Sequence, residues 1–148
     1  KNIQKEKGDM YDYMIIDTRP SFGGLTEAAI LAADILLTPV CLDKFCRDNL
    51  ALVDTYLDSV PSNIRPVWKI FVNKVYPKRK VQKAIVSDLC KKHDYPIMES
   101  CITGSETVNT ALQLYKPVQK HRSGCKVCDD YMNLVDEIEH MEIERRDD

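Results

Sequence analysis

The sequence has no long uninterrupted apolar run, no excess of charge of one sign and no secretion signal. The longest apolar stretches, such as residues 30–37, are interrupted by an aspartate and are far shorter than the roughly 20 residues of a membrane span. With 21 basic and 23 acidic residues, the formal net charge is -2, so no global positive field draws the chain onto nucleic acid or lipid. These absences exclude a membrane span and favour a cytoplasmic protein.

The composition is that of an ordinary folded domain. The chain has 148 residues, of which 44% are hydrophobic and 30% are charged, so neither disorder nor a fibrous repeat fits it. This length is sufficient for one domain with a substantial core. We therefore expect a single domain over residues 1–148, with a charged lead-in at 1–10 and an acidic tail at 142–148.

Apolar periodicity predicts strands that alternate with helices. Buried strands are expected at residues 11–16, 35–40, 66–73 and 97–102, and helices at 26–33, 48–60, 81–93, 108–115 and 127–141. Strands that alternate with helices of about a dozen residues pair in parallel through right-handed crossovers. The predicted fold class is therefore α/β, a three-layer αβα domain with a mainly parallel sheet.

Three loops follow the carboxyl ends of the predicted strands. They are Asp17 to Gly24, Val40 to Phe45 and Asn73 to Lys80. Ligands of open parallel sheets bind beyond the carboxyl ends of the strands. We therefore expect the three loops to line one common edge and to form one site.

The first of these loops has the residue types of a nucleotide-hydrolysing site. An apolar run ends in Asp17 and continues to Gly23 and Gly24, like a Walker B strand followed by a switch loop. A carboxylate at the tip of a rigid strand can hold hydrated magnesium beside phosphates, and glycines let the next loop change shape on hydrolysis. On spacing alone the alternative stays open that Asp17 only caps the following helix.

The wider string at residues 11–21, Tyr-Asp-Tyr-Met-Ile-Ile-Asp-Thr-Arg-Pro-Ser, resembles the ParA/MinD family of partitioning ATPases. That family usually has Asp-Thr-Pro-Pro-Ser at the end of this string. The resemblance continues through Ala32-Ala33-Asp34, Pro39-Val40, Phe45, Leu50 and Lys116-Pro117-Val118. It covers most of the chain, from Tyr11 to about Met141, and implies a P-loop NTPase-like fold.

The resemblance implies an ATPase that acts in plasmid or chromosome partitioning, or in positioning, in the bacterial cytoplasm or at most on the nucleoid. It implies ATP or ADP and magnesium as cofactors of the intact protein, a homodimer when ATP is bound, a ParB-like centromere-binding partner and no membrane partner. Asp17 would be catalytic and would contact magnesium through water. The residues that would contact the nucleotide are Asp17, Thr18, Pro20, Gly23 and Asn73.

Asn73 ends a predicted strand, where P-loop relatives often use asparagine to read the adenine edge with a paired donor and acceptor. As a turn-forming residue the same asparagine needs no ligand, so this alternative stays open.

Two features depart from the family pattern. Members begin with a strand and a deviant phosphate loop that holds the phosphates, and nothing of that kind precedes Tyr11. We therefore expect no nucleotide on this chain alone. Either a preceding segment supplies the loop, or the chain is a remnant that binds partners without hydrolysis. Arg19 replaces the first proline of the switch; it could serve a phosphate site or be a solvated loop cation.

The densest basic cluster includes Lys78, Arg79 and Lys80, which could contact DNA phosphates or simply be solvated. Many relatives carry an arginine in the loop after the last strand, which aligns here with residues 103–107. This segment has no cation and one acid. We therefore expect weak, nonspecific DNA binding.

The six cysteines are not expected to form a disulfide scaffold, because the chain is long enough for a core and lacks a secretion signal. Free cysteines in apolar-periodic segments behave as small buried hydrophobes. Those in such segments are Cys41, Cys46, Cys90 and Cys101.

Cys125 and Cys128 form a CxxC motif near His121, a pattern that also occurs in zinc and redox sites. A second cysteine pair is missing, and redox CxxC motifs usually follow a first strand. A thiol or zinc protein is therefore the third interpretation, after the ATPase and the partner-binding remnant.

Overall fold

The computed structural model describes residues 11–19, 21–42, 44–76, 84–87, 89 and 94–141. The strands are β1 (Ile35–Cys41), β2 (Val67–Val75) and β3 (Ile97–Thr103). The helices are α2 (Gly24–Ala32), α3 (Lys44–Ser59), α5 (Glu106–Gln113), α6 (Val118–His121) and α7 (Lys126–Glu139), with a short 3-10 turn, η2 (Ser62–Ile64). Residues 84–87 are also helical, within the predicted helix at 81–93, whereas the predicted lead-in and acidic tail lie outside the described residues.

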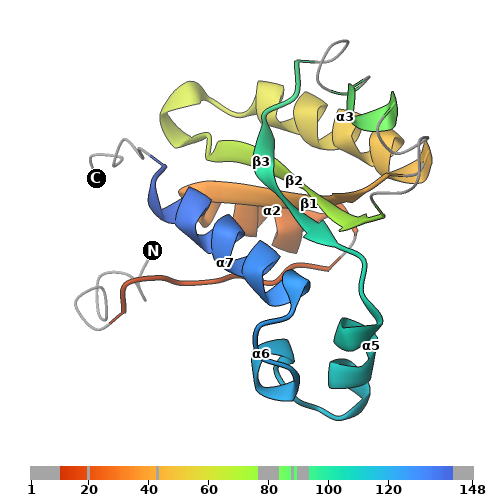
Figure 1. The fold of residues 1–148 in the computed structure, drawn as a ribbon. Coiled ribbons are helices and arrows are strands. Elements are labelled where there is room, and N and C mark those ends of the chain that lie inside the picture. The colour runs from red at the N-terminus through yellow and green to blue at the C-terminus, as the bar shows by residue number, and fades with distance from the viewer. Residues whose placement is uncertain are drawn as a thin grey trace.

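The three strands form one parallel sheet in the order β1-β2-β3 (Figure 1). β1 and β2 pair without interruption, from Ile35 opposite Val67 to Cys41 opposite Asn73. The ladder between β2 and β3 is parallel too, but β3 is bulged between the residues that face Ile70 and Val72. The parallel α/β fold predicted from the alternation of strands and helices is therefore confirmed.

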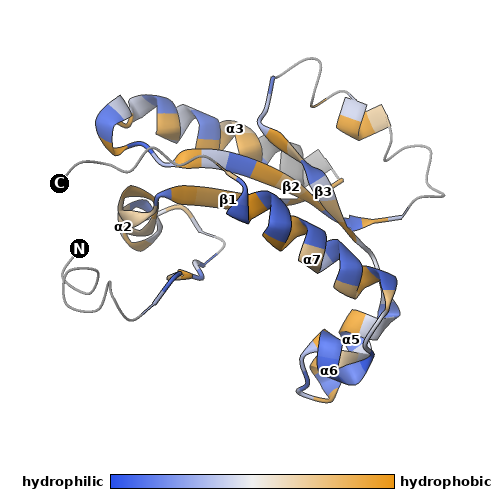
Figure 2. Cartoon of the chain, turned by 60° about the vertical axis from the view of Figure 1, so that its left-hand side comes forward, coloured by the Kyte–Doolittle hydropathy of each residue, from blue (hydrophilic) through white to orange (hydrophobic). Residues whose placement is uncertain are grey.

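The side chains of β2 alternate between two cores, one on each face of the sheet. Ile70 and Val72 pack with Leu50 of α3 and with Leu89. Phe71 points to the opposite face and packs against the cluster that α7 supplies. Because successive strand residues face opposite ways, a central strand must be apolar on both faces. Helices cover both faces, and Figure 2 shows hydrophobic and hydrophilic residues mixed along α7 as expected of a helix half in contact with the sheet.

The predicted buried strand at residues 11–16 is wrong. This run forms no strand and precedes α2 as an exposed segment (Figure 1), with the Ile15 side chain 92% exposed. A strand needs ladder hydrogen bonds and cover on both faces, and among the described residues β1 pairs only with β2. Local β-propensity was therefore insufficient to bury the run.

Several helix boundaries differ from the predicted ones. α3 begins at Lys44 rather than at residue 48. α5 begins at Glu106 rather than at residue 108, because the Ser105 hydroxyl accepts a hydrogen bond from the Thr107 N–H at 3.2 Å and caps the helix. The short helix α6 was not predicted; it follows Pro117 and is only one turn long.

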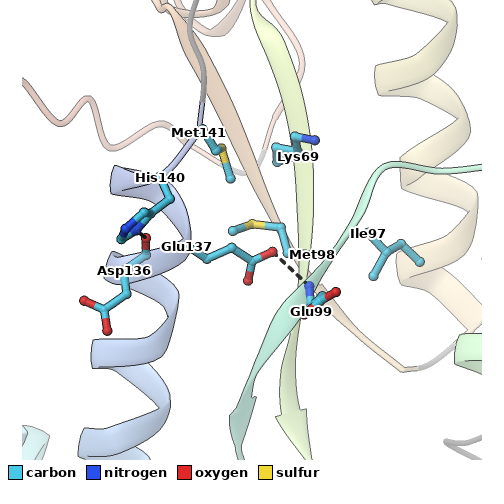
Figure 3. A pocket seen from close by; sticks show the side chains of 8 residues that line it. All are labelled: Lys69, Ile97, Met98, Glu99, Asp136, Glu137, His140 and Met141. Atoms are coloured by element: carbon cyan, nitrogen blue, oxygen red, sulfur yellow. Dashed lines mark hydrogen bonds between the residues drawn. The ribbon is translucent and has the colours of Figure 1, made fainter.

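Helix α7 binds the outer edge of β3 through two carboxylates. Glu137 accepts a hydrogen bond from the N–H of Glu99 at 2.9 Å (Figure 3) and another from the N–H of Ser100 at 2.8 Å, and Asp130 accepts one from Thr103 at 2.8 Å. Asp130 and Glu137 are seven residues apart on a helix, and Ser100 and Thr103 are three residues apart on a strand, so both pairs are separated by about 10 Å. The spacing of the two carboxylates therefore equals that of the N–H groups when α7 and β3 run antiparallel. Three N–H groups of the bulged edge strand are thereby satisfied without another strand.

The same contacts set the protonation of both carboxyl groups. Burial of Glu137 would raise its pKa, but the hydrogen bonds from Ser100 and Glu99 outweigh burial and lower it. Burial likewise opposes ionisation of Asp130, but the hydrogen bond from Thr103 and the ion pair with Lys126 at 3.0 Å lower its pKa. Both groups are therefore bound as carboxylates.

We predict that Glu137→Gln lowers the free energy of unfolding by about 1 to 3 kcal/mol at neutral pH, because an amide offers only one acceptor oxygen to two N–H groups. A lowered folded pKa means that the stabilisation is complete above the unfolded pKa of about 4.3 and is lost as the pH falls through the folded pKa. The deficit of the variant should therefore shrink in acid. Urea unfolding of the wild-type protein and the variant at neutral pH and near pH 3 measures the deficit and its change with pH.

The matched control is Glu139→Gln, which removes an exposed charge two residues further along α7. We expect a change within about 0.5 kcal/mol at either pH. An equal loss in both variants, or a Glu137→Gln deficit that persists in acid, would contradict a specific role for the Glu137 carboxylate.

Candidate functional site

The carboxyl ends of the strands meet at one edge because the sheet is parallel. Cys41, the last residue of β1, lies opposite Asn73 of β2, and Thr103, the last residue of β3, lies opposite Val75. The loops after β1 and β2 therefore start side by side, as the sequence predicts. This edge is the candidate functional site.

Asn73 is half-buried at this edge and has two roles open to it. Its side-chain oxygen accepts a hydrogen bond from the N–H of Lys74 at 2.9 Å, and Lys74 adopts a positive φ of 55°. The turn-forming contact is therefore present. The amide NH₂ group makes no hydrogen bond within the described residues, so its donors remain available to a ligand.

A tyrosine and a glycine close the edge between β2 and β3. The Gly104 N–H donates to the carbonyl of Val75 at 2.9 Å, and the ring of Tyr76 occupies the space that a Cβ on residue 104 would need. A side chain at residue 104 would therefore require the Tyr76 ring to move. This pair was not predicted from the sequence, whose only signal for it is a glycine two residues after the predicted strand at 97–102.

The first predicted loop, Asp17 to Gly24, does not reach this edge at Phe22. The Phe22 ring packs edge-to-face on Tyr56 of α3, with 5.1 Å between ring centroids. Tyr56 lies about 18 Å along the helix axis from Lys44, where α3 begins just after β1. The loop follows the unpaired run at residues 11–16, so no strand pairing holds it at the carboxyl edge.

The predicted switch residues are exposed. Asp17, Thr18 and Arg19 make no hydrogen bond or ion pair within the described residues, and Pro20 lies outside them. Gly23 is extended, and a Cβ there would meet open space. The free carboxylate of Asp17 and hydroxyl of Thr18 are oxygen donors of the kind that hydrated magnesium prefers, so the donor chemistry fits this ion.

The predicted basic residues are not among those that the structure describes at this edge, and the cysteines differ in exposure. Lys78, Arg79 and Lys80 lie outside the described residues. Cys41 is half-buried, but Cys101, expected to be buried, is exposed. It lies on the edge strand β3, which α7 covers only in part, so its side chain is reached by solvent.

A pocket of about 490 Å³ lies away from the carboxyl edge, between α7 and the first residues of β2 and β3 (Figure 3). Its lining residues are Lys69, Ile97, Met98, Glu99, Asp136, Glu137, His140 and Met141. None of the predicted site residues lines it. Glu137 already binds the β3 backbone there, so the pocket belongs to the contact between α7 and β3.

Neither a metal cluster nor a membrane-spanning helix is present among the described residues. They contain no group of three or more His, Cys, Asp or Glu side chains that could hold a metal ion. No helix in that part of the chain is both long and apolar enough to cross a bilayer.

Comparison with known proteins gives consistent matches. Residues 1–70 match the model of a family described as AAA domain. The chain is 29% identical to a ParA family protein of Chlamydia muridarum over 93% of this chain and 54% of that protein. It is 24% identical to the chromosome partitioning protein ParA of Myxococcus xanthus, over 86% of this chain and 46% of that protein.

A third relative is the chromosome-partitioning ATPase Soj of Treponema pallidum, 23% identical over 93% of this chain and 56% of that protein. The chain thus spans about half the length of the curated relatives it matches. The family-model match includes the string at residues 11–21, and each of the three relatives matches at least 86% of this chain. The chain is thus similar over most of its length to ParA-family partitioning proteins.

Proposed function

We propose that these residues serve a ParA-like ATPase that segregates or positions a plasmid or chromosome through ATP-dependent dimerisation, with a ParB-like protein as partner. The observation that carries the proposal is the parallel edge at which Cys41 and Asn73 lie opposite each other. Nucleotides bind at such edges in open α/β sheets. The family names of the relatives point to the same chemistry.

Within this proposal Asp17 contacts magnesium through water, Thr18, Pro20 and Gly23 form the switch beside the phosphates, and Asn73 donates to the base. Magnesium, when bound, neutralises charge on the phosphates. The exposed run at residues 11–16 supports a further step. Several large apolar side chains are exposed there, and such a patch is usually covered in the working protein. Pairing of this run as a strand would orient Asp17 toward the nucleotide edge.

The second candidate is a partner-binding remnant without hydrolysis. It is favoured by the contact of Phe22 with Tyr56, which holds the loop Asp17 to Gly24 away from the carboxyl edge. The gene sequence upstream of Lys1 discriminates the two. A phosphate-loop motif there supports the ATPase, and its absence supports the remnant.

In a version of the protein that includes a phosphate loop, we predict that Asp17→Ala lowers steady-state ATP hydrolysis by about a hundredfold or more, since positioned charges at phosphates typically contribute that much. Because Asp17 is exposed and has no partner in the described residues, the fold should be unchanged by circular dichroism. The control is Asp58→Ala, which removes only a surface pair with Arg65. Wild-type turnover in a folded Asp17→Ala protein would remove Asp17 from the mechanism.

We predict that Asn73→Asp weakens ATP binding by about tenfold, close to 1.4 kcal/mol, in the same longer protein. Aspartate retains the oxygen that accepts from Lys74, so the turn is preserved, but it replaces the free NH₂ donors with a carboxylate. Titration calorimetry with ATP measures the difference. Unchanged affinity would leave Asn73 as a turn-forming residue only.

We predict weak, nonspecific DNA binding that is lost near physiological salt. Each lysine or arginine contact contributes about one unit to the salt slope, so Lys78, Arg79 and Lys80 support a slope of roughly three or less. Fluorescence anisotropy with a labelled duplex across a salt series measures it. Changing all three residues to alanine should abolish binding.

A matched triple variant changes three exposed cations near α6, Lys116, Lys120 and Arg122, to alanine. Binding should be retained. If this control loses binding while the first triple variant keeps it, the DNA-binding surface lies near α6 instead.

A further inference from the structure

Two thiols meet at the start of α7. Cys125 is the N-cap residue and Cys128 lies three residues later, and their Sγ atoms are 3.0 Å apart. Cys125 has extended backbone angles, φ -89° and ψ 150°, and follows Gly124 at φ 67°. This non-helical entry brings the first side chain next to the second, so the motif predicted from sequence is a close pair in space.

The two thiols differ in exposure. Cys125 is half-buried and reachable by solvent, whereas Cys128 is only 5% exposed, with its Sγ 3.4 Å from the Arg122 carbonyl oxygen. The hydrogen bond from Cys128 lowers the pKa of Cys125, and giving that bond raises the pKa of Cys128. A thiolate at a helix N-terminus is also stabilised by the helix dipole. The pair thus has an accessible nucleophile and a protected second thiol.

A dithiol site needs only two sulfurs, whereas a structural zinc site needs four ligands. The described residues offer no third His, Cys, Asp or Glu side chain placed to join the pair. In reducing compartments, protein disulfides are typically transient and redox-active. The geometry therefore suits reversible oxidation better than metal binding.

We propose that Cys125 and Cys128 form a reversible dithiol/disulfide site that exchanges with low-molecular-weight disulfides. The Cys125 thiolate attacks one sulfur of the disulfide, whose S–S bond breaks, and the expelled thiolate takes a proton from solvent to become the first thiol. Cys128 then loses its proton to solvent and attacks Cys125 Sγ, which breaks the mixed disulfide, and the second expelled thiolate likewise takes a proton from solvent. The protein loses two hydrogens and two electrons, and the small disulfide is reduced to two thiols. The sulfurs must approach by only about 1 Å to reach bonding distance.

The test equilibrates the chain in graded ratios of oxidised to reduced glutathione, blocks free thiols by alkylation and identifies each cysteine by mass spectrometry. We expect the Cys125–Cys128 disulfide at a ratio about tenfold or more below the one that half-modifies exposed Cys101, because the second step is intramolecular. No disulfide at ratios that modify Cys101 would overturn the proposal, as would stoichiometric zinc in the purified protein. This measurement uses the wild-type chain and needs no variant to fold.

Single variants test the order of attack. Cys128→Ala should accumulate a mixed disulfide on Cys125, whereas Cys125→Ala should leave buried Cys128 unmodified. Cys101→Ala, the matched control, should form the Cys125–Cys128 disulfide at the wild-type ratio. Equal modification of Cys125 and Cys128 in the two single variants, with circular dichroism unchanged, would contradict the assigned roles.

Discussion

The hydrogen bonds from the edge of β3 to two α7 carboxylates are the interaction on which the rest of the described fold depends. Backbone N–H groups on an edge strand must find acceptors, and here Asp130 and Glu137 supply them from a helix rather than from a strand. Both carboxylates stay ionised because the hydrogen bonds outweigh the penalty of burial. The contact also tolerates the bulge in β3, since one Glu137 carboxylate accepts from two successive N–H groups.

These hydrogen bonds lie next to the candidate site. Asp130 binds the N–H of Thr103, the last residue of β3, and the next residue, Gly104, donates to Val75 and packs under the Tyr76 ring. The carboxyl end of β2, which carries Asn73, is therefore linked to α7 through the end of β3. The same helix begins with the Cys125–Cys128 pair, one turn before Asp130. Structural support and thiol chemistry thus share one helix.

The proposed nucleotide site depends on the segment at residues 11–17, whose position is not determined by its local preference for strand structure. Asn73 is at the edge because an unbroken parallel register puts it opposite Cys41. Asp17 follows a run that has the β-propensity for a strand but pairs with none of the described strands. The proposed ATPase requires that pairing, and the contact of Phe22 with Tyr56 must then be exchanged for it. A switch loop is suited to such an exchange, since it must occupy two positions.

The sequence by itself predicted the three paired strands, most of the helices, the parallel pairing and the resemblance to ParA-family proteins, because periodicity and residue strings are local properties. It also located Asn73 at a strand end and the two thiols of the CxxC motif. Tertiary structure decided what depends on partners distant in sequence. The run at residues 11–16 is unpaired because a strand needs a neighbour, and Cys101 is exposed because β3 is an edge strand. The roles of Glu137 and Asp130 could not be predicted from the sequence either. An acidic residue in a helix is expected to face solvent unless the N–H groups opposite it are known.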